Sequence, residues 1–334
     1  MDQLFKQCVG IDIAKLTFTA CISQYYISGE LIQSDVAEFE NNKTGFNQLT
    51  KWCRKSLSIQ IPTLFLMGAT GVYYEQLAYH LHKLDFKVSV VLPNKSKHYA
   101  MSLNIKSKND TIDAQVLSAM GCFQKLPLWN PPAPIYKKLK ALTRFREDLI
   151  KQHAILKNHL EALESSENPL ASIVKTYKKL LKGVAQAIED NDLQIKVLVE
   201  SDEKLNDKIR KMETIKGVGF NTIVIILAET QGFEMIVSRK QLASYAGLDV
   251  IERQSGTSVC GKTRISKKGN SHIRNALYFP AMVASRFNKP LKEDYLRIID
   301  KNKQHKKIGI TALQRKLLLL MYTLWKNDEV FVNA

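Results

Sequence analysis

The sequence lacks any run of apolar residues that approaches the roughly 20 needed to cross a membrane. Met1 to Phe5 contain no basic segment leading into an apolar one, as a secretion signal would. The five cysteines form no CxxC pair, and their odd number argues against a disulfide framework or a zinc site. We therefore expect a cytoplasmic protein with reduced thiols and no membrane partner.

Acidic residues are scarce relative to basic ones. The 334 residues include 49 Lys and Arg but 32 Asp and Glu, for a formal net charge of +17. Most of the excess lies between Ile251 and Ala334, with 17 Lys and Arg against 6 Asp and Glu. Nucleic acid is the usual partner of so basic a chain, and a merely solubilising surface is the alternative. The 45% hydrophobic content is enough for two or three domains with their own cores.

Residues 1 to 130 follow the element order of an α/β domain. Apolar segments predict strands over Gln7–Ser23, Tyr25–Ile32 and Val36–Asn41, in an antiparallel meander. The pattern continues with a helix over Thr44–Lys55, a strand over Thr63–Met67, a helix over Tyr73–Leu84 and a strand over Lys87–Leu92. A basic loop and a further helix follow. This order is typical of an RNase H-like fold, in which the later strands pair parallel with the first through helical crossovers.

One carboxylate, Asp12, interrupts the first apolar strand, where an unpaired buried charge would cost several kcal/mol. It must face solvent, pair with a cation or bind a metal ion. Asp110 and Asp113 share one face of the helix after the basic loop. Alternatively, Asp110 caps this helix and Asp113 adds to its acidic first turn. Because this fold places the first strand beside that helix, we expect three converging carboxylates that bind Mg²⁺ or Mn²⁺.

Residues 131 to 134, Pro-Pro-Ala-Pro, predict a stiff linker. Two long amphipathic helices with leucines at partial heptad spacing follow, from Tyr136 to Glu164 and from about Pro169 to Met212. We interpret residues 131–212 as a coiled-coil region that folds as an antiparallel hairpin or packs on another subunit, in a dimer or tetramer. An arm that contacts nucleic acid is the alternative.

Residues 213–334 predict an all-α domain. The segment Ile215-Lys216-Gly217-Val218-Gly219 resembles the turn of a helix-hairpin-helix, whose glycines expose backbone amides to phosphate. A tight turn between packed helices is the alternative. The stretch from Gly247 to Asn270 has the composition of a flexible basic loop. The candidate phosphate contacts in this loop are Lys262, Arg264, Lys267 and Lys268. Arg274, in the helix that follows, is a further candidate.

Three motifs of the first domain resemble the RuvC-like domain of the DEDD transposases, the IS110 family of insertion sequences, whose relatives include the Piv DNA invertase. They are Gly10-Ile11-Asp12-Ile13-Ala14-Lys15, Ala69-Thr70-Gly71-Val72-Tyr73-Tyr74 and Asn109-Asp110-Thr111-Ile112-Asp113-Ala114. The family carries Asp, Glu, Asp and Asp as its acidic set. Asp12, Asp110 and Asp113 match this set, whereas Gly68 stands where the glutamate is expected.

The stretch from Gly247 to Arg274 resembles the C-terminal transposase domain of the same family, in which a serine followed by glycine is the nucleophile on DNA. Ser255 is the matching position. The resemblance implies a covalent serine–DNA intermediate, metal assistance, donor and target DNA, and a guide RNA transcribed from the element. Two other functional classes stay open. One is a metal-dependent nuclease or junction resolvase in which water is the nucleophile. The other is a non-catalytic nucleic-acid-binding protein, which Gly68 favours because it supplies no metal ligand.

Overall fold

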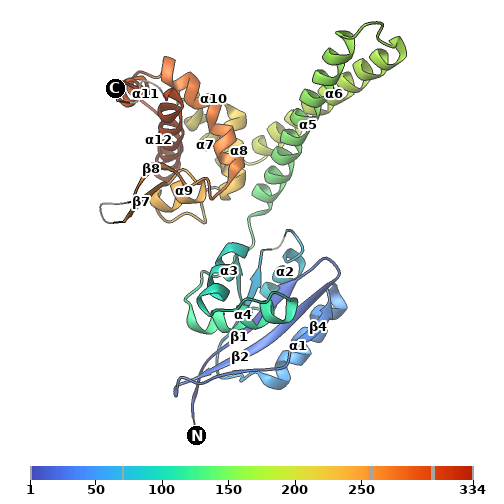
Figure 1. Ribbon diagram of the computed structural model, residues 1–334, viewed down its shortest axis with the longest axis vertical. Helices are drawn as coiled ribbons and strands as arrows, with labels where there is room; N and C mark the ends of the chain where they lie inside the picture. Colours follow the sequence, from blue (N-terminus) through green and yellow to red (C-terminus); the bar gives the residue numbers. More distant parts are fainter. Residues whose placement is uncertain (1, 70, 256–258, 302–304, 333–334) are drawn as a thin grey trace. The chain divides into compact units, whose positions relative to one another are not determined.

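The computed structural model describes residues 2–69, 71–255, 259–301 and 305–332 (Figure 1). The side chains of five further residues lie outside this description: Arg253, Ser255, Val259, Cys260 and Lys262. The chain divides into two compact units, Met1–Pro131 and Pro132–Ala334. The division falls at the predicted proline-rich linker, and the predicted helical and C-terminal regions share the second unit.

The first unit is built on a six-stranded mixed sheet with the order β3-β2-β1-β5-β6, and β4 also pairs with β2. Its strands are β1 (Leu4–Ile13), β2 (Thr17–Tyr26), β3 (Leu31–Gln33), β4 (Ala37–Glu40), β5 (Thr63–Gly68) and β6 (Lys87–Val91). β2 pairs antiparallel with β1, β3 and β4, whereas β5 runs parallel to β1 and β6 parallel to β5. The predicted mixed α/β domain is confirmed.

Helices cover both faces of this sheet. They are α1 (Lys43–Ser56), α2 (Glu75–Lys83), α3 (Pro93–Ser102) and α4 (Asp110–Phe123). Alternate residues of β1 point to opposite faces, so Ile11 and Ile13 enter a core with α1 and α2. Gly10 faces α4, where a Cβ would lie 2.0 Å from the Ser118 nitrogen, so only glycine allows this approach. Asp12 is the next residue on the α4 face.

Three local predictions for this unit are wrong. The single strand over Gln7–Ser23 is a hairpin, because the chain reverses at residues 14 to 16, where no Gly, Pro, Asn or Asp signals a turn. The basic loop begins as helix α3, with Pro93 in its first turn, where proline is well tolerated. Asn109, and not Asp110, caps α4, since its side chain accepts a hydrogen bond from the Ile112 N–H.

The second unit begins with two long helices, α5 (Pro134–Glu164) and α6 (Ala171–Glu200), which pack side by side (Figure 1). Asn191 Nδ2 donates to the Leu142 carbonyl at 3.2 Å, and Lys178 Nζ lies 2.8 Å from Glu164 Oε1. The helices therefore form the predicted antiparallel hairpin. The second helix ends before the predicted Met212, because Asp202 caps a separate helix, α7 (Glu203–Glu213).

Helices α7 to α12 enclose one hydrophobic core, which also includes part of the hairpin. The remaining elements are α8 (Phe220–Thr230), α9 (Arg239–Tyr245), β7 (Val250–Ser255), β8 (Val259–Ile265), α10 (Ser271–Phe287), α11 (Lys289–Asp300) and α12 (Lys306–Asn327). β7 and β8 pair antiparallel. The helical character of this region is confirmed, but the all-α prediction is wrong. Glycine, serine and charge had favoured a loop, whereas Val250, Ile251 and Ile265 give the segment strand propensity.

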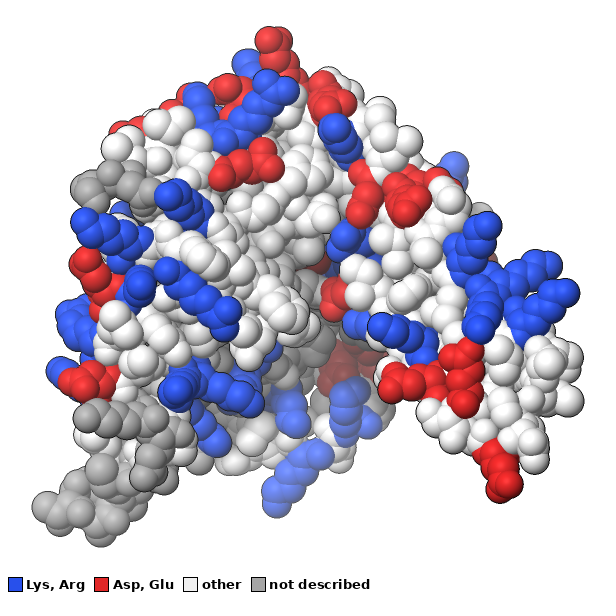
Figure 2. Space-filling model, turned by 90° about the horizontal axis from the view of Figure 1, so that it is seen from above, with Lys and Arg blue, Asp and Glu red and all other residues white. Residues whose placement is uncertain are grey.

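Charged side chains lie over much of the face seen in Figure 2, with groups of Lys and Arg between which Asp and Glu are interspersed. Along the ranges that the structure describes, no helix is long and apolar enough to cross a membrane.

Candidate active site

Asp12, Asp110 and Asp113 approach one another at the carboxyl end of β1. Asp12 is half-buried, and its β2 partner, Thr19, donates from Oγ1 to the Asp110 carbonyl at 3.1 Å. This bond ties the first turn of α4 to the sheet. Burial raises the pKa of Asp12, and the negative charges of Asp113 and Asp110 raise it further. The charges of Asp113 and Asp110 therefore act on the Asp12 carboxylate.

A cavity of about 480 Å³ lies beside these carboxylates. Asp12 and Asp113 line it, and Asp110 is not among the described lining residues. Lysines line it as well, from α3 and from the segment between α3 and α4: Lys97, Lys106 and Lys108. Carboxylates can hold a cation and lysines can attract a phosphate, so this cavity has the charges to bind both.

Lys108 places a positive charge directly beside Asp113. Its Nζ lies 3.0 Å from Asp113 Oδ2, and this bond raises the pKa of Lys108. Among the described residues, no group of three or more His, Cys, Asp or Glu is arranged to hold a metal ion. The donor chemistry of the aspartates fits Mg²⁺ or Mn²⁺, which prefer hard oxygen ligands. For Asp113 Oδ2 to serve as such a ligand, it has to compete with Lys108.

Gly68, the position of the expected glutamate, borders the same cavity. It ends β5, where it pairs with Val91 of β6. Ile11 pairs with Met67 in the parallel ladder, so Asp12 and Gly68 are the next residues on adjacent strands. Both line the cavity, so Gly68 lies near Asp12. A side chain here would reach the acidic site, and glycine supplies none.

In the second unit, the candidate nucleophile and basic residues lie along one β-hairpin and the loop after it. Ser255 is the last residue of β7, and its side chain, like that of Lys262, lies outside the described part of the chain. Arg264 is exposed on β8, and Lys267 and Lys268 are exposed just beyond it. This segment therefore offers several solvent-facing cations close in sequence to Ser255.

Arg274 differs from these cations because its guanidinium has backbone partners. Its Nη1 donates to the Ala246 carbonyl at 2.7 Å and to the Gly269 carbonyl at 3.1 Å. Arg274 thus holds the loop after β8 to the end of α9, and phosphate contact was the only role that the sequence suggested for it.

The Gly217 turn combines features of both interpretations made from the sequence. Gly217 has a φ of +100°, and a Cβ there would lie 3.0 Å from the Ala284 nitrogen, so this glycine packs tightly against α10. Gly219 is the N-cap of α8 and is exposed, as is Lys216. Close packing explains Gly217, while Gly219 and Lys216 leave the start of α8 accessible to an anion.

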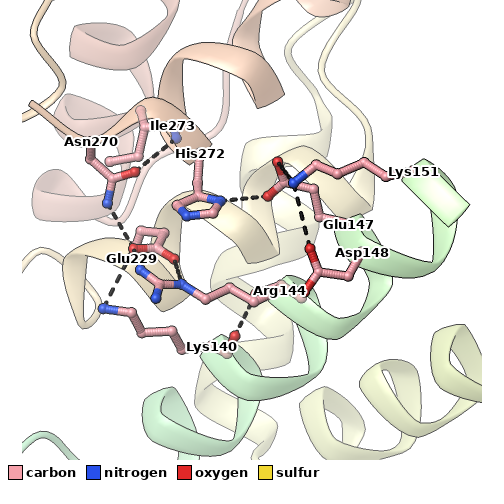
Figure 3. A network of polar contacts seen from close by, with 10 residues as sticks. Lys140, Arg144, Glu147, Asp148, Lys151, Glu229, Asn270, His272 and Ile273 are labelled. Carbon is pink, nitrogen blue, oxygen red and sulfur yellow. Dashed lines mark hydrogen bonds and ion pairs between the residues drawn. The ribbon is translucent and has the colours of Figure 1, made fainter. Parts of the chain in front are cut away.

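A buried carboxylate, Glu229 of α8, anchors the loop after β8 (Figure 3). Glu229 is 1% exposed and accepts hydrogen bonds from Arg144 Nε at 2.8 Å and Nη2 at 3.1 Å. Asn270, the N-cap of α10, donates to the same carboxylate at 2.7 Å. Burial acts to raise the pKa of Glu229, but the bond from Arg144, the charge of Lys140 and the bond from Asn270 outweigh it and lower that pKa.

A second contact, between His272 Nδ1 and Glu147, also joins α10 to α5 (Figure 3). Sequence reasoning missed both contacts because their members come from segments far apart in the chain. The one local signal was Asn270, which has the residue type of an N-cap just before a helix.

Comparison with known proteins matches both halves of the chain to transposases. The family described as "Transposase IS116/IS110/IS902 family" matches residues 209–296, which include Ser255. A DEDD transposase family of the IS110 type matches residues 9–166, which include Asp12, Asp110 and Asp113.

Two pilin gene-inverting proteins, from Moraxella bovis and Moraxella lacunata, are each 32% identical to this chain, over 327 and 330 residues. Each alignment covers 98% of this chain and 98% of the relative. Among solved structures, a Ppx/GppA family protein from Aquifex aeolicus aligns with 97% of this chain and 92% of its own, at 9% identity and a TM-score of 0.23. A score this low supports no conclusion.

Proposed function

Because this chain belongs to the IS116/IS110/IS902 transposase family and is therefore a DNA recombinase, we propose that it exchanges DNA strands through a covalent bond between DNA and the Ser255 hydroxyl. The observation that supports this most is the order of the two matches. An acidic half containing Asp12, Asp110 and Asp113 precedes a half containing Ser255.

The proposed step conserves the number of phosphate ester bonds. Ser255 Oγ attacks a DNA phosphorus, an Oγ–P bond forms, and the bond from phosphorus to the leaving sugar oxygen breaks. The serine proton passes to a base, and the leaving oxygen takes up a proton. A sugar hydroxyl from another strand then attacks the serine–phosphate and releases the serine. A serine hydroxyl is a weak nucleophile near neutral pH, so its proton must be accepted and the phosphate charge offset.

The residues that would offset this charge come from both units. Arg264, Lys267 and Lys268 are exposed near Ser255 in the sequence and can bind phosphate oxygens. Asp12, Asp110 and Asp113 are the groups that would hold Mg²⁺ or Mn²⁺. When bound, such an ion polarises a phosphate and stabilises developing negative charge. The proposal requires the acidic cavity and the Ser255 hairpin to act on the same DNA.

The partners in this proposal are donor DNA, target DNA and a guide RNA from the element. The relatives from Moraxella are named for inverting a pilin gene, which is a rearrangement of DNA. If an RNA pairs with the DNA, the protein needs to bind mainly backbone and shape, and base pairing selects the sequence. The net charge of +17 suits a protein that binds several polyanions at once.

We further assign the α5–α6 hairpin to contacts between subunits of a dimer or tetramer. Several large apolar side chains on these helices are 43% to 62% exposed: Phe145, Ile150, Ile155, Ile173, Leu180, Leu193 and Val197. Apolar surface distributed along both helices is typical of helices that pack on another subunit.

Trapping the covalent adduct tests the function directly. Wild-type protein is incubated with DNA and Mg²⁺ and denatured, and the adduct is separated and mapped by mass spectrometry. We expect Ser255→Ala to lose the adduct and strand exchange but to keep DNA binding, while the matched control Ser258→Ala keeps all three. An adduct at Ser258 or Ser266 would overturn the assignment of Ser255. Cleavage by wild type without an adduct would indicate a nuclease that uses water, and binding without cleavage would indicate a non-catalytic protein.

A further inference from the structure

The outer face of α10 exposes large apolar side chains in a row. Phe279, Val283 and Phe287 follow one another at four-residue spacing and are 71%, 41% and 67% exposed. This spacing advances about 6 Å along a helix and keeps the side chains on one face. Tyr278, 39% exposed, lies beside them, with its ring centroid 5.6 Å from that of Phe279. Single exposed apolar residues are ordinary, but a contiguous aromatic row marks an interaction surface.

The helix that carries this row is firmly held. Ile273, Leu277, Ala281 and Ala284 lie on its opposite face and are fully buried in the core of the second unit. Helices α8, α11 and α12 contact α10. The exposed rings therefore project from a rigid support. Such a support lowers the entropy cost of binding, because the rings are already in place.

The charges around the row favour a polyanionic partner. α10 contains no Asp or Glu, and Arg286 is exposed within the same face. Lys289 and Lys292 are exposed at the start of α11. A second copy of this chain would bring an equally basic surface to the same place, so like charges would oppose self-association here. Aromatic rings combined with an arginine and flanking lysines are the usual composition of surfaces that stack on nucleic-acid bases.

We propose that this aromatic face (Tyr278, Phe279, Val283, Arg286 and Phe287) stacks on unpaired bases of single-stranded DNA. The inference rests on the proposed function, because strand exchange is what separates DNA strands and exposes bases. In this proposal the aromatic face contacts the bases of the DNA, while the basic loop contacts its phosphates. Stacking tolerates any base, so the face would hold a separated strand without reading its sequence.

The test compares an oligothymidylate with an abasic strand of equal length, which carries the same phosphates but no bases. Wild-type protein should bind the oligothymidylate more tightly than the abasic strand. In the double variant Phe279→Ala/Phe287→Ala, the affinity for the oligothymidylate should fall roughly tenfold or more, so that the difference between the two strands is lost. The salt dependence should stay unchanged, because no phosphate contact is removed. Neutralising Lys267 and Lys268 should have the opposite effect. The affinity should depend less steeply on salt concentration, and the preference for oligothymidylate over the abasic strand should remain. Phe5→Ala, which removes a 54% exposed ring on β1, is the control and should behave as wild type.

A conservative variant keeps the test independent of folding. Phe279→Trp retains an aromatic ring, and its added fluorescence should be quenched by the oligothymidylate but not by the abasic strand. Equal wild-type affinity for the two strands would overturn the proposal. So would a preference for oligouridylate over oligothymidylate, which would assign the face to RNA. If the double alanine variant dissociated an oligomer but kept the preference for oligothymidylate, the aromatic face would be assigned to contact with a second copy of this chain. Failure of wild type to bind any nucleic acid would instead overturn the proposed function.

Discussion

The Lys108 ammonium lies 3.0 Å from the Asp113 carboxylate, beside the cavity that Asp12 also lines. This lysine therefore holds a position from which it competes with a metal ion for the same carboxylate. Its side chain is 82% exposed, so the pair is weak and can open readily. The same charge opposes the rise in the pKa of Asp12, and Asp113, Asp12 and Asp110 all raise the pKa of Lys108, so Lys108 interacts with all three carboxylates.

Replacing Lys108 with Met should tighten Mg²⁺ binding, because the competing cation is lost. An exposed ion pair of this kind corresponds to roughly a two- to fivefold change in affinity. Calorimetric titration of Mg²⁺ into wild type and Lys108→Met measures it. Lys106→Met is the control, since Lys106 lines the same cavity but forms no described ion pair with Asp113. Weaker binding by Lys108→Met would mean that Lys108 orients Asp113 and does not compete for it.

Asp12→Asn should stabilise the metal-free protein at neutral pH. Folding raises the pKa of Asp12, so its ionised form destabilises the folded state. This cost is absent below the pKa of the unfolded chain, about 3.9, and develops as pH rises through the higher folded-state value. Thermal unfolding with a chelator should therefore show a higher Tm for the variant at pH 7 and no difference in strong acid. The exposed control Asp35→Asn should change Tm little at either pH, and a variant less stable than wild type at pH 7 would contradict the argument.

Gly68→Glu should tighten metal binding and raise recombination. A glutamate there would add a fourth carboxylate beside Asp12, where wild type relies on three and is expected to be only weakly active. Added like charge should also lower the stability of the metal-free protein. Gly68→Gln, which adds similar volume without charge, separates the two effects. Calorimetry and a recombination assay on the three proteins provide the measurement. Equal activity of wild type and Gly68→Glu would mean that the fourth carboxylate is dispensable or comes from another residue.

Arg144→Met should lower the free energy of unfolding by about 1 to 3 kcal/mol, because it removes two hydrogen bonds from a buried carboxylate. Folding lowers the pKa of Glu229. The contribution of the pair is therefore complete above the unfolded-state pKa, about 4.3, and is lost as pH falls through the lower folded-state value.

Denaturant unfolding at pH 7 and in acid measures this effect. The difference between wild type and Arg144→Met should be large at pH 7 and shrink in acid. Arg146→Met is the matched control, since its partner Asp192 is 35% exposed and water can replace the arginine. Equal losses in the two variants would show that burial of Glu229 does not set the strength of its pair.

Local pattern in the sequence predicted much of the fold, including the strand that carries Asp12. An apolar, β-branched run predicted a strand with Asp12 between Ile11 and Ile13, which the structure buries on the opposite face. Helical periodicity gave α1 and α5 to within one or two residues of their ends. Ser238 has the residue type of an N-cap, and its Oγ accepts a hydrogen bond from the Gln241 N–H at the start of α9. Such features depend on neighbours in the chain, so the sequence alone determines them.

Contacts between distant segments were decided only by the tertiary structure. Arg144 and Glu229 are separated by 85 residues, and Asn270 and Glu229 by 41. The sequence identifies these side chains as polar but does not say which will be buried together. The Lys108–Asp113 pair and the place of Gly68 beside Asp12 likewise follow from the path of the chain and the register of β1 with β5. Burial and pairing are set by the packing of whole elements, and this packing fixes both the raised pKa of Asp12 and the lowered pKa of Glu229.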